Sequence, residues 1–316
     1  MTLVTESRFP GFTESLIEVQ QRVDIDLSRL KARVDGERTQ ATSLLELKSQ
    51  LGALIYAHFH LQNPKTSGVS LHDSQDLSQA LIDCIPHQNH YQLADFLSSS
   101  RQEGLTRIQI MGLKVSLPSY LVESTNLPGK VRVTLPNWRR NTTPGYLLAL
   151  SEQPLQIMSH DSLVRLYIGC DTAEKALETW KNTLEILSLL GANYQVKALS
   201  ARASYPRSDG IVVYIADKDR GHVVTALSEL EVIATANDNQ EYSLFAQPVG
   251  PNIAIAAEPN DTRSTYQGLS FGQHRSRVLV DALLNAACTH QTLQECWNQE
   301  TLSAGIDATF PAFNSV

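Results

Sequence analysis

Hydrophobic residues in the first hundred positions recur at the spacing of an α-helix. In residues 12–34 and 41–61, apolar side chains return at the interval that places them on one helical face. Two shorter stretches, 76–85 and 91–99, predict short helices. We therefore expect a helical N-terminal region over residues 1–105.

From residue 106 the pattern changes to short alternating or apolar runs, which are typical of β-strands. Longer amphipathic stretches between these runs predict helices. In chain order, strands are expected at 106–112, 130–136, 145–151, 163–170, 193–200, 209–217, 241–249 and 252–258, and helices at 171–191, 220–234 and 272–297. The predicted fold class is α+β: the helical N-terminal region is followed, over residues 106–316, by a mixed, largely antiparallel sheet with packed helices.

The composition favours a folded, acidic protein with a sizeable core. Hydrophobic residues make up 42% of the chain, and the net charge is −7. An acidic balance argues against general binding to the phosphate backbone, so we expect no nucleic-acid partner. No run approaches the roughly 18 apolar residues of a membrane span. The four cysteines form no CxxC pair. We expect reduced thiols, a cytoplasmic location and no membrane association.

Several familiar catalytic motifs are missing from the sequence. It contains no GxSxG, GxxxxGK[ST], HExxH or GxGxxG. These motifs place a serine nucleophile, a phosphate-binding loop, zinc ligands or a dinucleotide-binding turn. Serine hydrolase, P-loop, zincin and Rossmann dehydrogenase functions therefore lose their main support.

Polar residues inside the predicted strands indicate a site. Side chains alternate along a strand, so Arg165 and Tyr167 share one face of "LVRLYIGC". If the strands are neighbours, one sheet face also carries Lys197 and Tyr214. Lys197 is then a candidate proton acceptor, because burial and nearby cations favour its neutral amine. The alternative is an antiparallel sheet with one solvated face.

Two further segments place polar residues at the ends of predicted elements. "YPRSDGIVVY" brings Arg207 and Asp209 to the start of a strand, although an ordinary Asp-Gly turn explains the same residues. In "SFGQHRSR", Ser270 can cap a helix whose N-terminus attracts an anion, and Arg275 can grip phosphate with its planar fork. The alternative is a capped, solvated helix start.

Two other histidines stand outside these segments. His60 lies in "HFHL" and His222 in "GHVVTAL". We interpret both as packing or surface residues.

The order of these segments resembles a known family. "LVRLYIGC", "YQVKAL…YPRSDGIVVYI", "LFAQPVGPNIAIAAEPND" and "SFGQHRSRVLVDAL" are similar, in order and spacing, to the HopA-type type III effector family, over roughly residues 128–283. Where that family usually has AEEP or AEDP, this chain has Ala257-Glu258-Pro259. HopA-like proteins also occur in the biosynthesis of class V lanthipeptides and thioamitides, beside a phosphotransferase-like kinase. There they are understood as lyases that eliminate phosphate from phosphoserine or phosphothreonine and leave dehydroalanine or dehydrobutyrine.

The resemblance implies a cytoplasmic, metal-independent phosphoserine/phosphothreonine lyase without a cofactor. Its expected partners are a phosphorylated precursor peptide and a kinase. By analogy, Lys197 is the expected base, and either His274 or Tyr214 is the acid. Phosphate is expected to bind Arg165, Arg207 and Arg275, and the rest of the substrate to contact Tyr167, Asp209 and Ser270. The alternative is a non-catalytic peptide- or partner-binding module, including a secreted effector that acts on a host protein.

Overall fold

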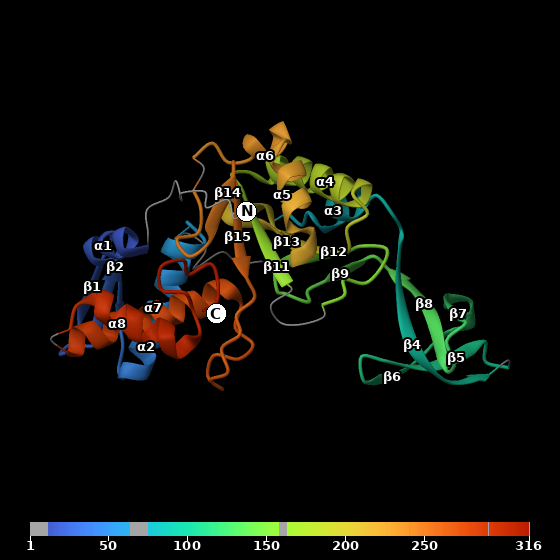
Figure 1. The fold of residues 1–316 in the computed structure, drawn as a ribbon, viewed down its shortest axis with the longest axis horizontal. Coiled ribbons are helices and arrows are strands. Elements are labelled where there is room, and N and C mark those ends of the chain that lie inside the picture. Colours follow the sequence, from blue (N-terminus) through green and yellow to red (C-terminus); the bar gives the residue numbers. More distant parts are fainter. Residues whose placement is uncertain are drawn as a thin grey trace, which may run out of the picture.

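The structure is a computed structural model that describes residues 12–63, 75–100, 102–157, 163–239, 241–289 and 291–315. It is α+β, and every strand pair in its three sheets is antiparallel. Figure 1 shows the largest sheet between two groups of helices, with a smaller sheet projecting to one side. The predicted fold class is therefore confirmed.

Seven strands form the central sheet, in the order β14-β15-β11-β13-β12-β10-β9. Their bounds are β9 Trp138–Arg140, β10 Tyr146–Leu150, β11 Leu163–Cys170, β12 Tyr194–Leu199, β13 Arg207–Ala216, β14 Gln247–Gly250 and β15 Ile253–Ala257. The predictions for β10 to β13 and β15 are confirmed, because these buried apolar runs carry an unambiguous strand pattern. The stretch 241–249 is a strand only at its end, in β14.

Four helices cover one face of this sheet (Figure 1). They are α3 Ser78–Asp83, α4 Ala173–Leu189, α5 Arg220–Ser228 and α6 Glu231–Ala234. Thr172 caps α4 by accepting a hydrogen bond from the amide of Lys175, and Gly191 follows the helix at a φ of 63°. Trp180 of α4 is fully buried, so this face of the sheet is a dry core.

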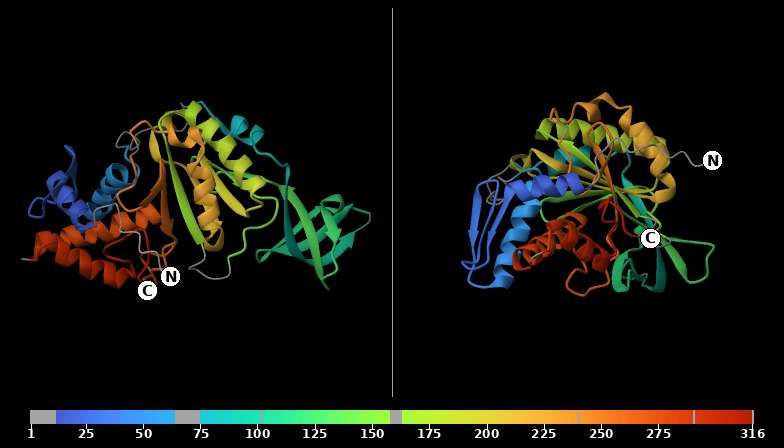
Figure 2. Two further views of the ribbon diagram at one scale, coloured as in Figure 1. Left: turned by 45° about the horizontal axis from the view of Figure 1, so that its top comes forward. Right: turned by 60° about the vertical axis from the view of Figure 1, so that its left-hand side comes forward.

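The opposite face carries the remaining helices (Figures 1 and 2). They are α1 Phe12–Arg22, α2 Leu44–Ile55 with a π-helical turn over Tyr56–His60, α7 Phe271–Cys288 and α8 Leu293–Ala304. The stretch 272–297, predicted as one helix or a helical pair, is such a pair. These helices leave part of the sheet uncovered, and the candidate site lies there.

The helix predicted over residues 12–34 is wrong beyond Arg22. The chain continues as a three-stranded meander of β1 Val23–Asp26, β2 Lys31–Val34 and β3 Glu37–Gln40. Asp35 and Gly36 join β2 to β3 at φ values of 47° and 88°. Two residues at positive φ make the hairpin turn that an Asp-Gly pair favours, so the turn decides against a helix.

The helix predicted over residues 91–99 is also wrong, because these residues lie inside β4. This strand belongs to a five-stranded sheet with the order β6-β5-β4-β8-β7. The strands are β4 Asn89–Ser100, β5 Leu105–Ile110, β6 Leu113–Pro118, β7 Val122–Ser124 and β8 Lys130–Pro136. We call this sheet the projecting sheet, since it stands away from the helices in both figures.

The projecting sheet begins and ends at one place. Asn89 of β4 pairs with Pro136 of β8, so the chain enters and leaves the sheet on adjacent strands. Its small core contains Ala94, Ile108 and Val133 and is separate from the two larger cores.

Among the described residues, no helix has the length and apolar character needed to span a membrane.

Candidate functional site

A pocket of about 780 Å³ lies on the uncovered part of the central sheet. The strands β11, β12 and β13 form its floor, and loops rise around it. It is lined by residues 142–144, 258–262 and 266–270 together with Arg165, Lys197, Tyr214 and Gln273. The first turn of α7 therefore forms one wall, as its polar sequence suggested.

The floor unites three of the predicted site residues. Arg165 of β11 lies opposite Tyr214 of β13, and Lys197 of β12 lies opposite Val212 of the same strand. Because β13 lies between β11 and β12, all three polar side chains project from one sheet face. The predicted shared face is confirmed for these residues.

Lys197 stands in this pocket without a counter-ion. Its Nζ lies 4.7 Å from the ring centroid of Tyr146 and 5.7 Å from that of Tyr214. In the described part of the chain it has no hydrogen-bond or ion-pair partner. Lys197 is half-buried and lines the pocket, and Asp209 acts on it only through space, so the amine is available to a ligand.

Arg165 is held by Glu258 at the edge of the pocket. Its Nε donates to Oε2 of Glu258 at 2.7 Å, and Nη2 donates to the same oxygen. The guanidinium also lies 5.2 Å from the ring centroid of Tyr214. Burial opposes its charge, but Tyr167, Tyr214 and Glu258 outweigh that effect and raise the pKa of Arg165. The side chain is therefore a fixed cation beside Lys197.

Arg207 and Asp209 form a closed cluster that does not line the pocket. Nε of Arg207 donates to Asp209 at 2.7 Å, and Nη2 donates to Asp209 and to the Tyr146 hydroxyl, each at 2.8 Å. Tyr146 in turn donates to Asp209 at 2.9 Å. Burial raises the pKa of Asp209, but Arg207 lowers it by more, so the resulting pKa is about 2. The structure thus places this pair under Tyr146, whose ring supports Lys197.

His274 and Arg275 also lie outside the pocket lining. Both are fully buried in α7. Nη1 of Arg275 donates to Nδ1 of His274 at 2.8 Å, so the imidazole proton sits on Nε2, 3.0 Å from Asp261. Arg275 further donates to the carbonyl oxygens of Pro311 and Phe313. These bonds join α7 to the C-terminal segment.

Burial governs the ionisation of both residues. It lowers the pKa of His274 to about 4, with a smaller contribution from Arg275. It lowers the pKa of Arg275 to about 9. His274 is therefore a neutral imidazole at neutral pH, with both nitrogens engaged.

Ser270 begins α7 as predicted. Its hydroxyl accepts from the amide of Gln273, and the Gln273 side chain accepts from the amide of Ser270. This reciprocal arrangement is a capping box. Ser270 also lines the pocket. Capping and proximity to the pocket, which the sequence left as alternatives, are both present.

Tyr167 and His60 pack together behind the pocket. The two rings meet edge to face at 5.5 Å, and Phe271 lies 5.9 Å from Tyr167. Nδ1 of His60 lies 2.7 Å from the Ser243 hydroxyl, and burial lowers the pKa of His60 to about 4. His60 is a packing residue, as interpreted, and His222 is half exposed near Asp219.

The residues missed by the sequence reasoning are Tyr146 and Glu258. Tyr146 opens β10 and contacts both Lys197 and Arg207, while Glu258 orients Arg165. An alternation argument could have found Tyr146, since it shares a face with Leu148, which lies opposite Lys197. Glu258 follows β15 in a loop, where no periodicity assigns a partner.

The sequence model of the HopA1 effector protein family matches residues 138–313, which is more than half of the chain. The chain belongs to the HopA1 effector family. Every residue that lines the pocket falls within the HopA1 match. No curated protein matches the chain at a significant level.

Two solved effector structures from Pseudomonas syringae are similar to this HopA1-family chain. The effector from pv. tomato strain DC3000 shares 14% identity at a TM-score of 0.47, with 88% of this chain and 92% of that chain covered. The effector from pv. syringae strain 61 shares 15% identity at a TM-score of 0.46, with coverages of 84% and 89%.

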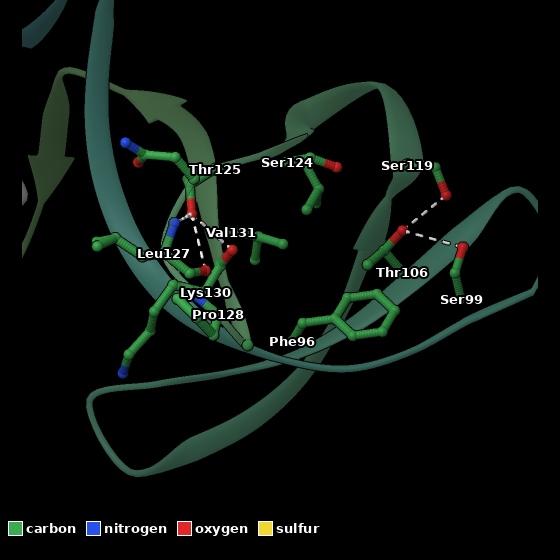
Figure 3. A pocket seen from close by; sticks show the side chains of 13 residues that line it. Phe96, Ser99, Thr106, Ser119, Ser124, Thr125, Leu127, Pro128, Lys130 and Val131 are labelled. Atoms are coloured by element: carbon green, nitrogen blue, oxygen red, sulfur yellow. Dashed lines mark hydrogen bonds between the residues drawn. The ribbon is translucent and has the colours of Figure 1, made fainter.

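A second hollow, of about 580 Å³, lies in the projecting sheet, before the HopA1 match begins (Figure 3). Hydroxyl groups line it: Thr106 bonds to Ser119 at 2.9 Å and lies 3.5 Å from Ser99. Its ionisable residue, Lys130, is paired with Asp95 at 2.6 Å. Among the described residues that line the hollow there is no unpaired acid or base, so we place the candidate chemistry on the central sheet.

Within the ranges that the structure describes, no three His, Cys, Asp or Glu side chains are grouped as a metal site.

Proposed function

We propose that this HopA1-family protein is a phosphoserine/phosphothreonine lyase that eliminates phosphate from a peptide. The observation that carries the proposal is the amine of Lys197, which lies without a counter-ion in a pocket beside the fixed cation of Arg165. β-Elimination needs a base at the α-carbon and a cation at the departing phosphate. These two side chains supply both requirements on one sheet face.

In the proposed reaction, the amine of Lys197 acts as the base and removes the α-proton of phosphoserine or phosphothreonine. The electron pair of that C–H bond forms the Cα=Cβ bond, and the Cβ–O bond breaks. Phosphate leaves with the electron pair of the broken bond, and dehydroalanine or dehydrobutyrine remains in the peptide. Arg165 stabilises the charge that develops on the phosphate oxygens.

Tyr214 is the better candidate for the acid. It lines the pocket, and its hydroxyl has no hydrogen-bond partner among the described residues. His274 neither lines the pocket nor has a free ring nitrogen. We assign His274 and Arg275 to holding the wall of the site. As the Cβ–O bond breaks, Tyr214 gives its hydroxyl proton to the departing phosphate oxygen. The proton that Lys197 took from the α-carbon then returns to the Tyr214 phenolate, whose ring centroid lies 5.7 Å from Nζ.

The test is incubation with phosphoserine and phosphothreonine peptides, followed by mass spectrometry for loss of phosphoric acid. We expect Lys197→Ala to lower the rate by about 10² to 10⁴ at unchanged thermal stability, the usual contribution of a positioned base. Lys218→Ala removes an exposed lysine after β13 and is the matched control. Full activity of Lys197→Ala would exclude this lysine as the base.

The alternative is a non-catalytic effector module, and membership of the HopA1 effector family supports it. Such a module predicts a phosphopeptide of unchanged mass, bound with an affinity that survives Lys197→Ala. A precursor-peptide gene and a kinase gene beside this one would favour the biosynthetic role, in which the kinase supplies the phosphorylated peptide.

A further inference from the structure

A groove of about 480 Å³ between α2 and α7 adjoins the pocket on the central sheet. Leu269 and Gln273 line both hollows, so the two meet at the first turn of α7. The rest of the groove is formed mainly by α2. A peptide that leaves the pocket towards α2 would cross this turn within a few residues of its phosphorylated residue, because an extended chain advances about 3.3 Å per residue.

The surface of the groove is mostly apolar. Gly52 and Ala53 of α2 form a shallow floor, and Leu45 stands at one side with 74% of its surface exposed. Of the two cations at the rim, Lys48 pairs with Asp281, and Arg277 donates to the carbonyl oxygen of Thr265. An apolar side chain in the groove would cover Leu45 and Leu269.

We propose that this groove binds an apolar side chain of the peptide substrate, within a few residues of the phosphorylated position. The proposal deepens the proposed function and rests on it, since the pocket fixes where the peptide lies. Burial of one leucine-sized side chain favours the bound state by about tenfold to a hundredfold. The groove would thus select which phosphorylated residue of a peptide is processed.

Gly52 provides a direct means of closing the groove. A β-carbon added at Gly52 would meet no atom within 4 Å, so a large side chain would extend into the groove and leave the core intact. Gly52→Trp is the blocking variant. Gly221 of α5 is the matched control, because it is also helical and open but lies with the helices on the other side of the sheet.

A second pair of variants changes chemistry instead of volume. Leu45→Asp places a carboxylate in the groove wall at a side chain that is already exposed, so the fold does not depend on it. Leu302 of α8 is 79% exposed and lies outside the groove, which makes Leu302→Asp its control. If both blocking variants lose the same preference, misfolding of one variant cannot explain the result.

The experiment compares phosphoserine peptides that carry one leucine, or one serine, at each position within three residues of the phosphoserine. kcat/KM for elimination is measured for each peptide. Dissociation constants are measured with matching α-methylphosphoserine peptides, which lack the α-proton and cannot be eliminated. We expect wild-type protein to prefer leucine at one position by at least tenfold in both measurements. Gly52→Trp and Leu45→Asp should reduce this ratio towards one, and the two control variants should retain it.

The two measurements separate the failure of each proposal. If the protein eliminates phosphate without any leucine preference, or if both blocking variants retain the preference, the groove proposal is contradicted and the lyase proposal is not. A leucine preference in binding that the blocking variants abolish, with no elimination of any peptide, would support the groove and overturn the lyase.

Discussion

Gly272 lies in the first turn of α7 against the ring of His60, and this contact leaves no room for a β-carbon. A β-carbon at Gly272 would lie 2.1 Å from Cδ2 and 2.3 Å from Nε2 of His60. The ring cannot move away freely, since it packs on Tyr167 and its Nδ1 is bonded to Ser243. The glycine is therefore required by packing and not by backbone conformation.

We expect Gly272→Ala to destabilise the protein by about 1–3 kcal/mol, the usual cost of overpacking a filled core. Urea unfolding measures the change. Gly221→Ala is the control, because its new methyl group meets open space in a helix and should be neutral or stabilising by up to about 1 kcal/mol. If Gly272→Ala were as stable as wild type, the ring of His60 would have to move aside without cost.

Side-chain alternation predicted the floor of the site, but it could not predict how charges pair. Arg165, Lys197 and Tyr214 share a face because strand geometry fixes it. All three arginines are bonded within the protein, but only Arg165, which is held by Glu258, also lines the pocket, whereas Arg207 and Arg275 do not. The partners of Arg275 lie 36 to 39 residues away in the C-terminal segment, where no local pattern predicts them, whereas Asp209 stands only two positions from Arg207 on the same strand face.

At the scale of elements, Arg275 links α7 to the C-terminal segment. The segment 306–315 has little regular structure of its own, and the guanidinium bonds to Pro311, Phe313 and Asn314. The amide of Ala257, at the end of β15, donates to Ala312 at 2.8 Å. The helix, the segment and the strand edge are thus joined at one buried cation.

We expect Arg275→Met to loosen this junction. The variant leaves the buried carbonyl oxygen of Pro311 without its donor, which costs about 1–3 kcal/mol, and removes one of the two donors to the carbonyl oxygen of Phe313. Hydrogen exchange should accelerate at least tenfold at the amides of Ala257 and Asp307, which donate to the segment. Arg277→Met is the control, and unchanged exchange in Arg275→Met would show that other contacts hold the segment.

Elements with strong periodicity were predicted well, and those decided by turns or distant pairing were not. α4 and β11 each carry a long, consistent pattern. The meander after Arg22 depends on a two-residue turn at Asp35 and Gly36, and β4 depends on pairing with β8 about 40 residues later. Apolar residues in these stretches fit a helical spacing by coincidence, so tertiary pairing overrides the local pattern.

For the whole molecule, buried histidines make stability depend on pH, among them His60, His274 and His90, each with a pKa lowered by burial. The pKa values of His60 and His274 are each lowered from 6.5 to about 4 in the folded state. Between pH 6.5 and 4 the unfolded chain therefore holds protons that the folded protein does not. Stability falls as the pH falls through this window, by up to about 1.4 kcal/mol per pH unit for each histidine.

Urea midpoints at pH 7, 6 and 5 test this expectation. Wild type should lose stability steadily over the range, and either His60→Gln or His274→Gln should reduce the slope, whatever its stability at pH 7, while His90 keeps the slope above zero. Asp209 affects stability only at lower pH. Its pKa is about 2 in the folded protein and 3.8 ordinarily, so its contribution to stability is lost as the pH falls from about 3.8 to 2. A midpoint constant from pH 7 to pH 5 would contradict the neutral assignment.

The projecting sheet also affects how the whole chain can fold. Once β4 and β8 pair, Asn89 and Pro136 lie side by side, so nearly 50 residues of chain shrink to the width of one strand pair. α3 precedes the projecting sheet and β9 follows it. Once the sheet has formed, the chain between α3 and β9 is effectively as short as a turn. Each halving of an effective loop lowers the entropic cost of closing it by about 0.6 kcal/mol. Early pairing of β4 with β8 would accordingly speed the closure of the central sheet on which the pocket is built.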